Sequence, residues 1–192
     1  QVDDSTSLLY SKLKIAKVEG TVEKLYFNKD QADQVSFKIT KEDSKWDDSD
    51  LTYGSETALT YGEGIDVAAM RGYSCVAYID MNDDSDLILK AIAPKAGRNK
   101  TLELNKKQAD NADVSASEIS YFKYFKNDSN DDKALKIKLD DNFKAYTNLD
   151  TTPLTDEEFE AIFNATNKDF TSIKLIENSN DNKYDLAIVT VY

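Results

Sequence analysis

Histidine is absent from the 192 residues, and Cys75 is the only cysteine. Without an imidazole, the chain has no Ser/His or Cys/His nucleophile pair and no histidine ligand for zinc or haem. A lone cysteine makes no internal disulfide, and its place in the apolar run SCVAYI predicts a buried, unreactive thiol. We therefore predict that the protein is not an enzyme.

Positive charge is also scarce. The chain has 24 Lys and Arg against 36 Asp and Glu, a net charge of −12, and its only arginines are Arg71 and Arg98. Nucleic-acid binding needs clustered cations for the phosphates, and an anionic membrane surface would repel this chain. No apolar stretch approaches the roughly 20 residues that span a bilayer. We expect no nucleic-acid partner and no membrane span in this fragment.

Proline and glycine are rare, with 2 and 6 residues, which excludes collagen-like and low-complexity classes. Hydrophobic residues make up 40% of the chain and include 11 Tyr and 8 Phe. A chain of this length and composition can bury about 70% of its unfolded surface. The sequence therefore predicts a folded protein with a packed core.

Apolar and polar residues alternate along most of the chain, which is the pattern of half-buried strands. We expect one long strand over 12–27, bent at Gly20, and a hairpin partner in QVSFKITKE. The segment 65–70 fits one helical turn that stops at Gly72. TALTY is a further short run, GYSCVAYIDM and DLILKAIAP read as a second hairpin, and KTLELN is expected to be a sixth strand. Residues 1–110 are thus predicted to form a small β-barrel or sandwich.

The polar connector KKQADNADVSAS marks the predicted boundary, and residues 111–192 form a second β subdomain. Its strands are EISYFKYFK, ALKIKL, FKAYTNL and a closing hairpin. One amphipathic helix is expected near 155–165, because Thr155 and Glu158 have the spacing of a capping box before an apolar stripe. The predicted fold class is mostly β with minor helix.

Carboxylates are abundant, so paired acids of a hydrolase are one hypothesis for function. The clusters Asp47, Asp48, Asp50 and Asp83, Asp84, Asp86 lie in predicted turns. Turn aspartates usually accept hydrogen bonds from nearby backbone N–H groups. We therefore rank this hypothesis last.

The turn ENSNDNKYD is the candidate metal site, a calcium turn formed by Glu177, Asp181 and Asp185. Calcium takes six to eight oxygen ligands and accepts flexible turns. However, Asn182 stands where an EF-hand loop has glycine, and Ile188 where it has a bidentate glutamate. The alternative is a hairpin turn that uses asparagine for left-handed backbone. No other cofactor is expected.

Aromatic residues offer a further hypothesis, a carbohydrate-binding module with exposed rings. Its candidates are Trp46, Tyr53, Tyr61 and the cluster from Tyr121 to Phe125. Rings on both faces of one strand are more typical of a segment buried between two layers.

The last segment, FTSIKLIENSNDNKYDLAIVTVY, resembles a closing hairpin of large surface proteins from clostridia-like Gram-positive bacteria, which often carry S-layer homology modules. The shared positions are Leu175, Ile176, Asp181, Lys183, Tyr184, Asp185 and Val189. The chain departs from the pattern at Glu177, Ser179 and Asn182. A second segment, GIDVAAMRGYSCVAYIDMNDDSDLILKAIAP, is similar to another segment of the same proteins at Gly72, Val76, Tyr78 and Asp80.

This resemblance implies a place and a role, and it brings no catalytic residues. It implies a secreted, extracellular module associated with the cell wall or S-layer, with a structural or adhesive role. Its partners would be neighbouring domains of a larger surface protein, or cell-wall glycans. Scarce cysteine and an acidic surface agree with such a location.

Overall fold

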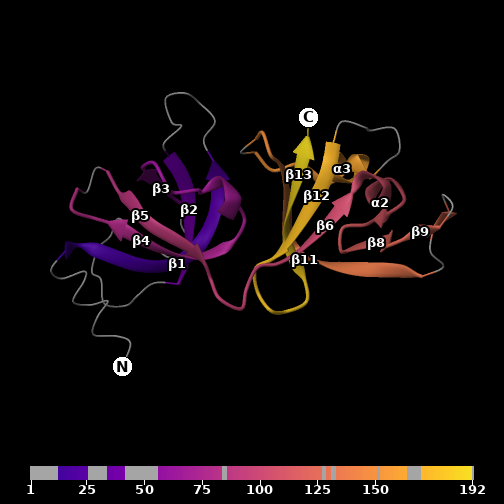
Figure 1. Ribbon diagram of the computed structural model, residues 1–192, viewed down its shortest axis with the longest axis horizontal. Helices are drawn as coiled ribbons and strands as arrows, with labels where there is room; N and C mark the ends of the chain where they lie inside the picture. The colour runs from indigo at the N-terminus through magenta and orange to yellow at the C-terminus, as the bar shows by residue number, and fades with distance from the viewer. Residues whose placement is uncertain are drawn as a thin grey trace. The chain divides into compact units, whose positions relative to one another are not determined.

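The computed structural model describes residues 13–25, 34–41, 56–83, 86–126, 129–130, 133–150, 152–163 and 170–191. The protein is mostly β with minor helix, as the sequence predicts. It divides into two compact units, Gln1–Gly97 and Arg98–Tyr192 (Figure 1). In the described part of the chain, no helix is long and apolar enough to cross a membrane.

The first unit is a closed barrel with the strand order β1-β2-β3-β5-β4. Its strands are β1 (Ile15–Leu25), β2 (Gln34–Lys41), β3 (Glu56–Tyr61), β4 (Ser74–Asp80) and β5 (Ile88–Pro94). Both predicted hairpins, β1 with β2 and β4 with β5, are confirmed as antiparallel pairs. A parallel pair between β3 and β5 closes the barrel.

Alternation along β4 shows how the barrel core is built. Cys75, Ala77 and Ile79 are buried, and the residues between them are half-buried. Cys75 has no exposed surface, and burial raises the pKa of its thiol to about 12. The prediction of a buried cysteine is therefore confirmed.

Glycines act at two positions in this unit. The pairing of β1 with β2 shifts register between Glu19 and Gly20, so the predicted irregularity at Gly20 is confirmed. A Cβ at Gly20 would lie under 3.0 Å from the Phe37 ring and from the Lys38 carbonyl oxygen. The predicted helical turn is a short 3-10 helix, η2 (Ala68–Met70), and Gly72 follows it with a φ of 79°.

The second unit is built on a six-stranded sheet with the order β6-β12-β13-β11-β8-β7. The strands of this sheet are β6 (Lys100–Asn105), β7 (Asp113–Val114), β8 (Glu118–Phe122), β11 (Ala134–Thr147), β12 (Phe170–Glu177) and β13 (Tyr184–Val191). The small pair β9 (Phe125–Lys126) and β10 (Ser129–Asn130) stands apart from it. The helices are α2 (Lys106–Asp110) and α3 (Asp156–Ile162).

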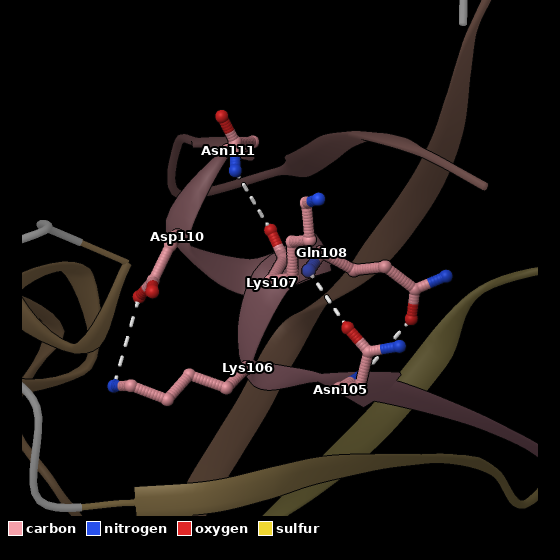
Figure 2. Close-up of polar contacts among 6 residues, drawn as sticks. All are labelled: Asn105, Lys106, Lys107, Gln108, Asp110 and Asn111. Atoms are coloured by element: carbon pink, nitrogen blue, oxygen red, sulfur yellow. Dashed lines mark hydrogen bonds and ion pairs between the residues drawn. The ribbon is translucent and has the colours of Figure 1, made fainter. Parts of the chain in front are cut away.

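The predicted boundary after residue 110 lies inside this second unit. Strand β6 pairs with β12 over its whole length, and Leu104 is buried in the core of the second unit. The polar segment expected to be a connector begins with α2. Figure 2 shows why this helix forms: the Asn105 side chain accepts from the Gln108 N–H, and the Gln108 side chain accepts from the Asn105 N–H. This capping box satisfies backbone donors that would otherwise be free.

Strand β11 unites two segments that the sequence suggested as separate strands. Residues 134–138 pair with β8 in antiparallel fashion, and residues 144–147 pair with β13 in parallel. The register shift between Leu139 and Lys144 lets one strand serve both neighbours. Helix α3 begins as predicted, because Thr155 and Glu158 form its capping box, and Phe159 and Ile162 face the core.

Candidate functional site

A cleft of about 470 Å³ opens at one end of the second unit's sheet. Its walls come from β6, β8, β11, β12 and the turn that leads into β13. The lining residues are Lys100, Leu102, Tyr121, Leu135, Lys136, Ile137, Lys138, Glu177, Asn182 and Tyr184. A volume of this size falls in the range of small-ligand sites.

Strand register explains why these residues meet. Glu177 is the last residue of β12 and lies directly across from Lys100, the first residue of β6. Tyr184 is the first residue of β13 and lies across from Leu139. Residues 134–138 of β11 pair with β8 on one edge, and no described strand pairs with their other edge. The cleft therefore forms where the sheet is incomplete.

Glu177 is the most unusual group in the cleft. Ile173, Leu175 and Glu177 alternate along β12, so this glutamate follows two core residues and is only 3% exposed. Its Oε1 accepts a hydrogen bond of 2.9 Å from the Asn182 N–H. Its Oε2 is buried and has no hydrogen-bond partner among the residues that the structure describes. A buried acceptor without a donor is uncommon and calls for an explanation.

The three residues of the predicted calcium turn each bind backbone of the turn itself. Besides the Glu177 bond, Asp181 Oδ1 accepts from the Lys183 N–H at 3.0 Å, and Asp185 Oδ2 accepts from the Asn178 N–H at 2.7 Å. Among the residues that the structure describes, no group of three or more acidic or cysteine side chains could hold a metal ion. Calcium binding here stays a prediction.

Asparagine does supply left-handed backbone in this turn, as the alternative interpretation expected. Asn182 has a φ of 63°, and its side chain is exposed. This conformation directs the Asn182 N–H to the Glu177 carboxylate, and it costs asparagine little.

Two titratable groups beside the turn have shifted pKa values. Burial raises the pKa of Tyr184, and the negative charge of Glu177 adds to the shift. The Tyr184 hydroxyl therefore stays protonated well above neutral pH. Burial also raises the pKa of Asp185, against the lowering effect of the Asn178 N–H.

Three lysines give the cleft a positive rim on an acidic protein. Lys136 is 3.1 Å from Glu118 in an exposed ion pair. Lys100 and Lys138 have no ion pair among the described residues. The cleft thus combines a buried acceptor, two tyrosines, apolar walls and unpaired cations, which suits the binding of a polar ligand.

The aromatic residues predicted to bind carbohydrate differ in exposure where they are described. Trp46 and Tyr53 lie outside the described residues. Tyr61 packs against the barrel core, and Tyr121 is 6% exposed. Tyr124 is 63% exposed, with the Lys123 ammonium 5.3 Å from its ring centre. A carbohydrate-binding module with exposed rings stays a prediction.

The predicted acidic clusters have a local role where they are described. Residues 47, 48, 50 and 84 lie outside the described ranges. The Asp83 carbonyl accepts from the Asp86 N–H at 3.1 Å, and Asp86 Oδ1 accepts from the Thr60 hydroxyl at 2.7 Å. The Asp83 carbonyl closes the turn between β4 and β5, and the Asp86 carboxylate joins this turn to Thr60 of β3.

Sequence reasoning selected Glu177 and Tyr121, for two different hypotheses, but not the lysines that line the cleft with them. No pattern near Lys100 or Lys138 predicts that these lysines line a site, because their positions depend on pairing between strands that are distant in sequence. Comparisons with protein-family models, with curated proteins and with solved structures find no match. The cleft is therefore interpreted from its geometry alone.

Proposed function

We propose that the chain is a non-catalytic, extracellular structural or adhesive module of a bacterial cell-surface protein associated with the S-layer. The observation that carries this proposal is a strand arrangement that occurs in both units. In each unit, the first and last strands flank one central strand and run antiparallel to it. The chain therefore enters and leaves each unit at opposite ends of that central strand.

In the barrel, the central strand is β4. Ile15 at the start of β1 pairs with Asp80, and Pro94 at the end of β5 pairs with Cys75. Tension between these ends pulls β1 and β5 in opposite directions along β4. The parallel pair of β3 with β5 adds a second attachment to the strand under load.

In the second unit, the central strand is β12, and Figure 1 shows β6, β12 and β13 side by side. Lys100 at the start of β6 pairs with Glu177, and Val191 at the end of β13 pairs with Phe170. The load is again directed along the strands.

Hydrogen bonds between antiparallel strands are perpendicular to the strand direction. A force along the strands therefore loads many of these bonds together, whereas a force across them breaks one pair at a time. The first geometry resists extension better, because the bonds of a whole strand must fail in one step. This resistance suits a module that links neighbouring domains under tension.

Composition and the resemblance support the same role. The net charge of −12 keeps such a module hydrated and limits association between copies. The closing hairpin, which resembles one in clostridial-type surface proteins, forms β12 and β13 of the loaded triplet.

Single-molecule force measurements on the full chain test this proposal. In a Cys75→Ala background, attachment through Arg98→Cys and Val191→Cys loads the second unit along its strands. The matched control uses Arg98→Cys with Asn180→Cys, which lie beyond the same end of β6 and β12 and so peel the strands apart. We expect a higher unfolding force for the first pair. Equal or lower force would remove the mechanical argument.

Localisation tests the rest of the proposal. An antibody against the native protein should label the outside of intact cells. Signal confined to the cytosolic fraction would overturn the extracellular role.

A further inference from the structure

We propose that the cleft beside Glu177 binds a short acidic saccharide, meaning a sugar ring that carries a carboxylate or a phosphate. This binding is independent of how the units respond to force. Three features of the cleft define the ligand class: an unsatisfied acceptor, unpaired lysines and apolar walls.

The unsatisfied acceptor selects a ligand with hydroxyl donors. Glu177 Oε2 is buried and has no partner in the described part of the chain, while Oε1 accepts from the Asn182 N–H. A donor that enters the cleft completes the hydrogen bonding of this carboxylate, and bonds to charged groups away from water are the stronger ones. The exposed Asn182 amide offers a further donor and acceptor at the mouth.

The lysines select against an ammonium donor and in favour of an anion. Lys100 lies across from Glu177 at the end of the paired strands, and neither Lys100 nor Lys138 has an ion pair in the described structure. A cationic ligand would meet their positive charge. A long polyanion would be repelled by a protein with a net charge of −12. A short sugar or a chain end with one anionic group satisfies both conditions.

The apolar walls fit the carbon face of a sugar ring. Leu102 of β6, Leu135 and Ile137 of β11, and Tyr184 of β13 all line the cleft. Sugar rings combine apolar C–H faces with a rim of hydroxyls, and binding sites commonly pair apolar walls with a few directed polar groups.

Nuclear magnetic resonance titration of the isotope-labelled full chain tests the site. The probes are a disaccharide that contains glucuronic acid, its carboxyl-reduced neutral form, and the same neutral disaccharide carrying a phosphate. We expect saturable shifts at the amides of Lys100, Asn182 and Tyr184 with an acidic probe, and weaker binding of the neutral form. The preference between carboxylate and phosphate identifies the anion.

Three variants test the assigned roles. Glu177→Gln keeps an acceptor for the Asn182 N–H and replaces the free acceptor, so affinity should fall about ten- to hundredfold. Lys100→Met should lower the affinity for the acidic probe about two- to fivefold and leave the affinity for the neutral probe unchanged. Asn182→Gly preserves the left-handed backbone and removes the amide, and it should also weaken binding.

Lys144→Met is the matched control, because Lys144 is an exposed lysine of β11 outside the cleft. It should bind like the parent chain. The proposal is overturned if neither acidic probe saturates at millimolar concentration, if the shifts map away from the cleft, or if the neutral form binds equally well. A loss of affinity in Lys144→Met as large as in Lys100→Met would also overturn it.

Discussion

Replacement of Gly20 by alanine should destabilise the barrel strongly. The new Cβ would lie under 3.0 Å from both the Phe37 ring and the Lys38 carbonyl oxygen. Phe37 is fully buried in the barrel core, and the carbonyl belongs to the paired strand β2. Overpacking of a core costs about 1–3 kcal/mol, and the involvement of backbone places this change near the upper end. A loss of about 3 kcal/mol corresponds to a roughly hundredfold rise in the open population.

The only cysteine of the chain provides the assay. Cys75 is fully buried in the barrel, and its pKa of about 12 keeps the thiol protonated in the folded state. A thiol reagent therefore labels it only when the barrel opens, and the labelling rate follows the open population when closing is fast. We expect Gly20→Ala to label about a hundredfold faster at pH 7.

The matched control is Gly62→Ala. A Cβ at Gly62 meets no described atom within 4 Å. The free energy of barrel opening should therefore change by no more than about 0.5 kcal/mol, and Cys75 should be labelled at nearly the parent rate. Parent-like labelling of Gly20→Ala would refute the argument that close packing at this position requires glycine. Equal acceleration in both variants would show that loss of any glycine, and not the local contact, causes the effect.

Three further changes should have smaller effects. Thr155→Ala removes the α3 cap and should lower the free energy of unfolding of the second unit by about 1 kcal/mol in urea, whereas Thr152→Ala, at an exposed position without a cap, should not. Burial raises the pKa of Asp185 in the folded protein above that of the unfolded chain. Ionisation of this carboxyl therefore lowers the free energy of unfolding as the pH rises from the unfolded pKa through the folded one. The stability of Asp185→Asn relative to the parent, from thermal unfolding at several pH values, should therefore increase from pH 4 to pH 7; an unchanged difference would contradict this. Glu19→Gln weakens the 2.8 Å ion pair with Lys95. It should lower the free energy of barrel opening, measured by labelling of Cys75, by at most about 1 kcal/mol, and by less in high salt.

Local patterns predicted most of the elements. Alternation located the strands of both hairpins in the barrel, and the Thr155 spacing located α3. The same kind of signal was present for α2, since Asn105 and Gln108 also have capping-box spacing, but the polar composition of the segment favoured a connector. Elements whose stabilising contacts lie close in sequence, such as capping boxes and hairpins, can therefore be predicted from the sequence.

Partners that are distant in sequence were not predictable. Strand β6 follows the barrel strands directly, yet its pairing with β12 places it in the second unit. The cleft depends on the same long-range register, which brings Lys100 opposite Glu177. No alternation within either segment specifies that register, so the sequence indicated an acidic turn and not the lysine-rimmed cleft beside it.

The position of β13 in its sheet affects how the protein is made. Strand β13 alone connects the β6–β12 pair with the β11–β8–β7 group. Once residues up to Pro94 have been synthesised, all described strands of the barrel are present. The second sheet is complete only after synthesis reaches Val191. During synthesis, no described strand of one half pairs with a strand of the other half until β13 emerges. The second unit must therefore complete its sheet late, when the described barrel strands are already available to fold.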